Sequence, residues 1–361
     1  MDRTHYFSNS YREAREKFLQ AASSGELSLR SYAHPLPGRD GEELAMDAAL
    51  FGPADSARLL LLASATHGLE GFCGSGLQLA LIDDEDFHSQ AAAAEVAVLY
   101  VHGVNPWGFS WLRRWTHENV DLNRNCIDFD NPEGVPDNPE YDALADVLVP
   151  ENWPDPEADE RLAAWIGENG FDALKDAVQH GQYRHPDGLF YGGSEPTWSN
   201  LTFRRVLRDF GGHCKRLALI DFHTGLGPEG HGEKILMLDD SAEKSARARR
   251  WWGEVTSLTE GDSVSSRIAG PLACLLPQEC PQAKVTDIAL EFGTVPPDVV
   301  LSALRADQWL YRTPAVDAET RENIKRLLLS AFYVDRADWK SAILDQGINT
   351  ARQAVSGLSA A

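Results

Sequence analysis

The sequence contains no hydrophobic run long enough to cross a membrane, because its uncharged apolar stretches fall far short of the about 20 residues that a membrane helix needs. Residues 1–11 carry charged side chains and no apolar core, so no secretory signal is visible. We therefore expect a cytoplasmic protein with no membrane partner.

Cysteine is scarce and irregularly placed. The five cysteines, Cys73, Cys126, Cys214, Cys274 and Cys280, are odd in number and form no CxxC pair. This pattern excludes a disulfide framework and a cysteine-rich metal site, and predicts reduced, mostly structural thiols.

Positive charge is also in deficit. Lys and Arg total 33 against 55 for Asp and Glu, a formal net charge of -22. A nucleic-acid partner is thus not expected, because phosphate binding needs a basic surface.

The chain has 361 residues, of which 43% are hydrophobic, and it has neither repeats nor low-complexity tracts. It can form one elaborated α/β domain over residues 1–361. Its oligomeric state does not follow from the sequence.

A first candidate site follows the apolar run 59–63. His67 and Glu70 lie three residues apart in the sequence ATHGLEG. An imidazole and a carboxylate with this spacing can bind one zinc ion where a strand gives way to a helix. Alone, the pair is weak evidence for a zinc site, because a catalytic zinc needs a third protein ligand. Glu70 is also compatible with the role of a carboxylate at a helix N-terminus.

A second apolar run, 216–222, ends at His223. Open α/β sheets build their sites outside the carboxyl ends of the strands, so His223 can complete a His, Glu, His zinc set with His67 and Glu70. The alternative is that both histidines are hydrogen-bonded loop residues. His102, His117, His213 and His231 are not assigned as ligands, because three ligands already leave the open position that hydrolysis requires.

Two further clusters complete an ordered series: ENVDLNRN at 118–125 and TDIALEFGT at 286–294. Over residues 58–296 the series HxxE, DLNRN, DFHTG and a carboxylate within an apolar strand resembles the zinc carboxypeptidase superfamily. It is most similar to the uncharacterised bacterial branch, a domain of unknown function, and more distantly to aspartoacylase-type deacylases. The resemblance implies a three-layer α/β/α fold with a mixed, largely parallel twisted sheet, and one zinc ion per chain.

Glu291, between Leu290 and Phe292, is the candidate general base. An apolar setting raises the pKa of a carboxylate toward the range that suits proton transfer. An ionised Glu in such a strand is costly unless it is paired. The structural alternative is therefore a buried Glu bridged to an arginine.

The resemblance also implies roles for the third cluster. Asn123 and Arg124 match the pair that holds the free carboxylate of the substrate, a task that suits the planar guanidinium. Asp121 matches a carboxylate that orients a zinc-bound histidine, although an aspartate here can equally bind loop backbone. Of two arginines upstream, Arg114 is chosen as the group that stabilises the oxyanion, with Arg113 as a substrate-binding candidate. We expect at least one of the two to be a surface charge.

The pattern departs from digestive-type carboxypeptidases at one point, because no tyrosine lies between His223 and Glu291 to match their mobile tyrosine. Tyr183 and Tyr191, in a segment rich in turn formers, are candidates to wall the pocket from the other side. Their alternative role is aromatic packing beneath a long loop.

The pattern of apolar residues predicts the elements around these motifs. Residues 59–65 and 96–102 are predicted parallel central strands, joined through a helical segment at 76–88. Residues 105–115 form a loop with aromatics, and 128–156, rich in Pro, Asn, Asp and Glu, an irregular insertion or lid. Further helices are predicted at 10–23, 160–169, 172–180, 197–210, 242–258, 299–309, 318–332 and 336–355, and further strands at 234–238 and near Ala273 and Ile288.

These features predict a zinc hydrolase that cleaves an amide bond beside a free carboxylate, most simply a carboxypeptidase-like metallopeptidase. An N-acyl amino acid deacylase would use the same metal and base, and a non-catalytic zinc- or peptide-binding module is a third alternative. The expected ligand is accordingly a small peptide or an N-acyl amino acid.

Overall fold

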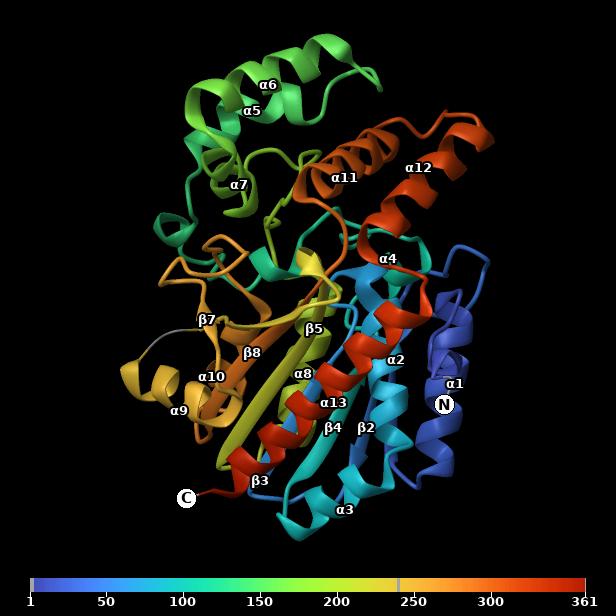
Figure 1. Ribbon diagram of the computed structural model, residues 1–361, viewed down its shortest axis with the longest axis vertical. Coiled ribbons are helices and arrows are strands. Elements are labelled where there is room, and N and C mark those ends of the chain that lie inside the picture. Colours follow the sequence, from blue (N-terminus) through green and yellow to red (C-terminus); the bar gives the residue numbers. More distant parts are fainter. Residues whose placement is uncertain (1–2, 239–240, 361) are drawn as a thin grey trace.

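The computed structural model describes residues 3–238 and 241–360 and is organised around one eight-stranded sheet (Figure 1). The strands are β1 (Ser28–Ala33), β2 (Ala45–Phe51), β3 (Arg58–Ala63), β4 (Ala97–His102), β5 (Arg216–Glu229), β6 (Gly232–Leu236), β7 (Thr256–Ser257) and β8 (Lys284–Gly293). Their order is β1-β2-β4-β3-β5-β8-β6-β7. The central strands β4, β3, β5 and β8 are parallel neighbours, whereas β2 and β6 run antiparallel on either side.

Thirteen α-helices accompany the sheet in the described residues. They are α1 (Tyr11–Ser24), α2 (Gly71–Ile82), α3 (Glu85–Ala93), α4 (Pro106–Ser110), α5 (Pro139–Leu148), α6 (Pro156–Asn169), α7 (Phe171–Gln179), α8 (Trp198–Gly211), α9 (Ala242–Trp252), α10 (Leu275–Glu279), α11 (Pro297–Arg312), α12 (Ala318–Phe332) and α13 (Ala337–Ser359).

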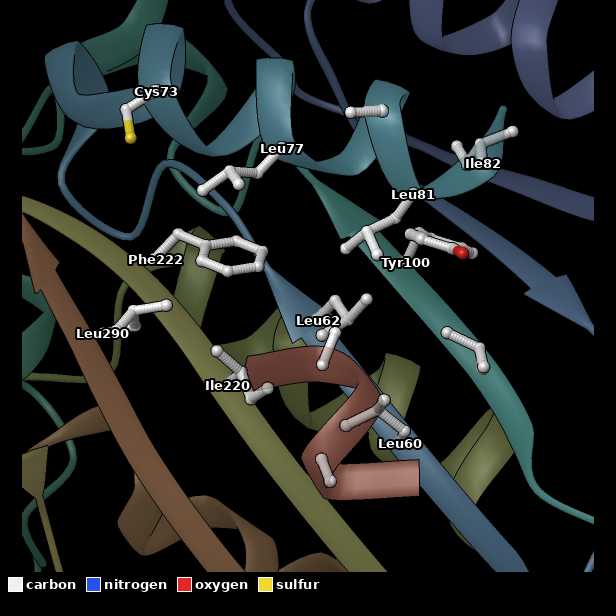
Figure 2. Close-up of a cluster of buried hydrophobic side chains, with 14 of the residues drawn as sticks. Leu60, Leu62, Cys73, Leu77, Leu81, Ile82, Tyr100, Ile220, Phe222 and Leu290 are labelled. Carbon is white, nitrogen blue, oxygen red and sulfur yellow. The ribbon is translucent and has the colours of Figure 1, made fainter. Parts of the chain in front are cut away.

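Alternate residues of the central strands belong to two separate cores, which explains their continuous apolar runs. Leu60 and Leu62 of β3 pack in one cluster with side chains of α2, such as Leu77 and Leu81 (Figure 2), and the cluster also includes side chains of α1 and α13. Leu59 and Leu61 pack in another with side chains of α8 and α10. Successive strand side chains point to opposite faces, so a strand covered on both sides is apolar throughout. The expected three-layer α/β/α fold with a mixed sheet is confirmed.

A third group of helices lies beyond the carboxyl ends of the parallel strands, at the top of Figure 1. Helices α5, α6, α7, α11 and α12 share a separate apolar cluster, which includes Leu144, Leu174, Leu304 and Leu328. We call this group the helical cap. The C-terminal helices therefore divide, since α11 and α12 join the cap and α13 lies along the sheet.

Several predicted elements needed correction. The segment 76–88 is part of two helices, α2 and α3, because Asp84 starts a new helix by accepting a hydrogen bond from the N–H of Phe87. The strand expected near Ala273 is helical, and the helix from 242 stops at Trp252, before Gly253 with its φ of 77°. The insertion 128–156 is not irregular throughout, because it contains α5.

Two expectations about composition can be compared with the structure. No helix in the described part of the chain combines the length and apolarity of a membrane span. All five cysteines are free thiols, and only Cys274 is partly exposed. This agrees with the predicted lack of a disulfide framework.

Candidate metal centre

The first ligand pair sits on a tight turn after β3. Ala65 has a φ of 60°, and the short 3-10 helix Gly68–Glu70 follows His67. A Cβ at Gly68 would lie 2.1 Å from the carbonyl carbon of Gly108, so only glycine allows this approach. The N–H groups of Gly68 and Leu69 donate to the carbonyls of Arg114 and Arg113. The turn is therefore fixed by backbone contacts on its far side.

His67, Glu70 and His223 converge from this turn and from β5. Each is at most 4% exposed, and one ligand atom from each lies within 4.8 Å of the others. The Nδ1 atoms of the two imidazoles are 3.2 Å apart, and each lies 3.1 Å from a different oxygen of Glu70. Two imidazole nitrogens and a carboxylate aimed at one point are a donor set that suits zinc.

A carboxylate lies beside the Nε2 atom of each histidine. Asp121 Oδ1 lies 3.1 Å from His67 Nε2, and Asp221 Oδ2 lies 2.8 Å from His223 Nε2. A carboxylate at Nε2 favours the tautomer with its proton there, which leaves the lone pair on Nδ1 for a metal. The residues present therefore fit a divalent ion, and Asp121 has the contact that its expected role requires.

Asp221 was not assigned from the sequence, although a signal was there. It precedes His223 by two residues on the same strand, so the two side chains share one face of the sheet. Its other oxygen accepts a hydrogen bond of 2.8 Å from the hydroxyl of Thr66, which fixes the carboxylate.

The charges of the centre are strongly coupled. Burial alone would raise the pKa of Glu70, but His67, His223 and Arg114 outweigh it and hold the pKa far below its usual range. Burial alone would lower the pKa of His223, but Asp221 and Glu70 raise it well above its usual range. The centre is thus a compact set of buried charges that stabilise one another.

The two candidate arginines point to different places. Arg114 lies 2.9 Å from Glu70 Oε1, 3.0 Å from Asp121 Oδ2 and 2.9 Å from His67 Nε2, beside the candidate metal ligands. Arg113 donates instead to Asp307, at 2.9 Å, and is absent from the cavity lining. The expectation that Arg113 binds substrate is corrected, because its guanidinium is buried in an ion pair with α11. Neither arginine is the expected surface charge.

Glu291 lies on β8, directly beside His223 in the sheet register. Burial, and next the charge of Glu70, raise the pKa of Glu291 to about 8. Its Oε1 accepts one hydrogen bond of 3.0 Å, from the N–H of Leu226. Within the described part of the chain it forms no ion pair, so the alternative of a structural bridge to an arginine is not seen.

Asn123 and Arg124 line the same cavity. Asn123 Oδ1 accepts from the N–H of Leu272, which leaves the amide nitrogen for other acceptors. Arg124 donates through Nε and Nη2 to the Gln179 carbonyl and through Nη1 to the Asn123 carbonyl. A guanidinium carries five N–H groups, so two are left for a carboxylate.

The candidate tyrosines do not line this cavity. The Tyr183 hydroxyl donates to the Arg124 carbonyl at 2.6 Å, and the Tyr191 carbonyl accepts from the N–H of Asp121. Both support the Asp121 to Arg124 segment from outside. Phe190 between them faces the cavity, with the guanidinium carbons of Arg114 and Arg124 at 5.2 and 5.3 Å from its ring centroid. Phe190 could not be predicted from the sequence, because nothing in its context separates it from its neighbours.

The cavity wall is mainly apolar, and the helical cap supplies many of its apolar residues. The cap contributes Phe171, Leu174, Val178, Val300, Leu301, Leu304 and Phe332, and the sheet side contributes Ile235, Met237, Leu258 and Ala289. No described residue of 128–156 is part of the wall. The part of the segment that forms α5 packs with α6 and α7 in the helical cap instead of lining the cavity.

The unassigned histidines lie elsewhere. His102 Nε2 lies 3.0 Å from the hydroxyl of Ser75, and its ring stacks on Phe18. His117 lies 3.0 Å from a carboxylate oxygen of Glu118. Neither belongs to the described ligand cluster.

Comparison with known proteins agrees with this architecture. A family model described as "Protein of unknown function (DUF2817)" matches residues 7–346. The chain belongs to this family. No curated protein matches this DUF2817 member.

Solved structures show the fold at low sequence identity. Bovine thrombin-activatable fibrinolysis inhibitor, in complex with tick carboxypeptidase inhibitor, is 11% identical with a TM-score of 0.53, over 98% of this chain and 98% of that chain. A second structure of thrombin activatable fibrinolysis inhibitor is 12% identical, with a TM-score of 0.50, over 98% and 76%. A metallo-carboxypeptidase from Burkholderia cenocepacia is 12% identical, with a TM-score of 0.48, over 97% and 70%. The DUF2817 member thus has the zinc carboxypeptidase-like fold.

Proposed function

We propose that this protein is a zinc-dependent hydrolase that cleaves an amide bond adjacent to a free carboxylate. The observation that carries the proposal is one cavity that joins the His67, Glu70 and His223 cluster to a buried Glu291 and to Arg124. These groups supply a metal site, an acid-base group and a carboxylate-binding group, the parts that such a reaction needs.

Each residue then has a defined task. His67, Glu70 and His223 would hold a zinc ion, which would act as a Lewis acid and lower the pKa of a water molecule. Glu291 takes a proton from the attacking water and delivers it to the leaving nitrogen, work that suits a carboxylate whose pKa is raised to about 8. Arg114 stabilises the developing negative charge, and Arg124 with Asn123 holds the substrate carboxylate.

The mainly apolar wall bears on the choice between a carboxypeptidase-like metallopeptidase and an N-acyl amino acid deacylase. Both activities fit the polar groups of the cavity, because either substrate would present one carboxylate and one amide to them. Apolar walls on α7 and α11 favour substrates with a large hydrophobic group, either a side chain or an acyl chain. We take the metallopeptidase as the first candidate and the deacylase as the second.

The test combines metal analysis with hydrolysis. Purified protein should contain about one zinc per chain, and a His67→Ala, His223→Ala double variant should lose it while it stays folded. Hydrolysis is assayed on dipeptides and N-acyl amino acids with hydrophobic groups. Glu291→Gln should keep the zinc and lose roughly 10²–10⁴-fold in rate.

Glu233→Gln is the matched control, because Glu233 is the register partner of Glu291 on β6 and is absent from the cavity wall. It should retain both zinc and activity. Unchanged turnover in Glu291→Gln would remove Glu291 from the mechanism. Absence of metal after zinc is supplied would remove the hydrolase proposal, and bound zinc without hydrolysis of any substrate would favour a binding module.

A further inference from the structure

A second cavity lies at the other end of the sheet from the candidate metal centre. Arg216 and Lys284, the first residues of the parallel strands β5 and β8, lie in its wall. Helices α9 and α13 contribute further lining residues; α13 runs down to the C-terminus in Figure 1, and α9 lies at the left of the same view. The candidate metal ligands lie toward the carboxyl ends of the parallel strands, whereas the second cavity lies at their amino ends. The two sites are therefore separated by the length of the sheet.

This second cavity is basic although the chain is strongly acidic. Its described lining contains five cationic side chains and no acidic one: Arg216, Arg247, Arg250, Lys284 and Arg352. Two carboxylates outside the wall pair with these cations: Glu243 with Lys284 and Arg247, and Asp84 with Arg352. An excess of positive charge is left in a protein whose net charge is -22. Such a local concentration of one sign attracts ligands of the opposite sign.

The cavity is a built structure rather than a surface patch. Arg247 is only 9% exposed, and its guanidinium donates to the hydroxyl of Thr286 at 2.7 Å and to the carbonyl of Val285 at 2.6 Å. Arg216 donates through Nη1 to the Leu358 carbonyl at 3.0 Å. These bonds hold two guanidinium groups in place before any ligand arrives, which reduces the entropy lost on binding.

Other lining residues limit the kind of ligand. Arg250, on the exposed side of α9, makes no hydrogen bond or ion pair with any other described residue, so its guanidinium is available. Gln353 Oε1 is a buried acceptor that lacks a hydrogen-bond donor in the described part of the chain. The indole of Trp251 lies directly against Gly357, where a Cβ would be 2.2 Å from Trp251 Cδ2, and this contact fixes an apolar wall.

We propose that this cavity binds a small organic phosphate that also carries a hydroxyl or amino group. The guanidinium groups of Arg216 and Arg250 match phosphate oxygens, which accept paired hydrogen bonds, and Arg247 adds positive charge to the wall. The donor group of the ligand meets the open acceptor of Gln353. A small ligand fits better than a nucleic acid, because a long polyanion would also meet the acidic surface around the cavity.

The test is calorimetric titration of the full, zinc-loaded protein with ribose 5-phosphate, and with ribose as the uncharged comparison. Ribose 5-phosphate should bind saturably, and ribose should not bind. Arg250→Gln removes one charged donor from an exposed position and should weaken binding about tenfold, with complete loss in Arg250→Glu. Far-UV circular dichroism reports that each variant is folded.

Arg161→Gln and Arg161→Glu are the charge-matched controls, because Arg161 is exposed on α6 in the helical cap. They should bind as the parent protein does. The proposal is overturned if ribose 5-phosphate shows no saturable binding, if Arg250→Glu binds it as tightly as the parent, or if the Arg161 variants weaken binding equally. None of these three outcomes depends on the hydrolase proposal, since hydrolysis is not measured.

Discussion

His223 and Glu291 are register partners on the adjacent parallel strands β5 and β8. Their spacing is therefore set by backbone pairing within the sheet and not by a loop. One strand contributes a candidate metal ligand, and its neighbour contributes the candidate acid-base group at the same height. A site built on strands holds its geometry more precisely than one built on loops, which is what proton transfer at a metal centre requires.

The carboxylate behind His223 leads to a first prediction. Asp221→Ala removes the partner of His223 Nε2 at 2.8 Å, so the tautomer with a free Nδ1 lone pair is no longer favoured. Zinc affinity should fall about 10- to 100-fold, measured by competition with a chelator. The exposed Asp55→Asn serves as control and should leave the affinity unchanged. An unchanged affinity in Asp221→Ala would mean that Asp221 does not orient the ligand.

The neighbouring arginines allow a matched pair of variants. Arg114→Lys keeps a positive charge but cannot bridge Glu70 and Asp121 in the same way, so kcat/KM should fall about 10²- to 10³-fold with modest loss of stability. Arg113→Lys should show the reverse, with near-normal kcat/KM and a loss of about 1–3 kcal/mol in the free energy of unfolding. Its bonds to Asp307, Asn119 and Gln308 hold α11 in place. Equal kinetic effects in the two variants would contradict these assignments.

A third prediction concerns acid sensitivity. Burial lowers the pKa of His102 to about 4, below the value of about 6.5 expected in the unfolded chain. The unfolded state then binds more protons between these values, so stability falls as the pH is lowered from about 6.5 to 4. At pH 5 the loss from this group is about 2 kcal/mol.

Urea unfolding at pH 7.5 and pH 5 measures the effect. His102→Gln should be less stable at pH 7.5, because it loses the stacking on Phe18, but should lose less stability on acidification. His213→Gln, at an exposed position, is the control and should keep the pH dependence of the parent. The same pH dependence in His102→Gln and the parent would remove His102 as its source.

The sequence predicted the centre of the fold well, for a physical reason. Runs such as Leu59 to Ala63 are apolar at every position, and only a strand buried on both faces requires this. The candidate metal ligands were predicted because they lie at the end of such an apolar run or within a few residues after it. The predicted helix boundaries were wrong where one polar residue determines where a helix begins, as Asp84 does between α2 and α3.

The cavity wall could not be read from the sequence. Arg113 and Arg114 are adjacent and chemically identical, and only the position of Asp307, 194 residues away along the chain, separates their roles. Likewise Leu174 and Leu304 have the spacing of ordinary core residues on amphipathic helices. That they face a cavity depends on how the helical cap packs, which involves contacts between distant segments.

A last prediction concerns the apolar wall and rests on the proposed hydrolysis. If substrates place a hydrophobic group among Leu174, Val300 and Leu304, each methylene added to that group is removed from water. One buried methylene contributes about 0.8 kcal/mol, so kcat/KM should rise about fourfold per methylene until the space is filled. Leu304→Trp should shorten the optimal chain, because the larger side chain occupies the cavity. Leu327→Trp, at an exposed position on α12, should leave the optimum unchanged. A rate that is independent of chain length in the parent protein would place the hydrophobic group outside this cavity.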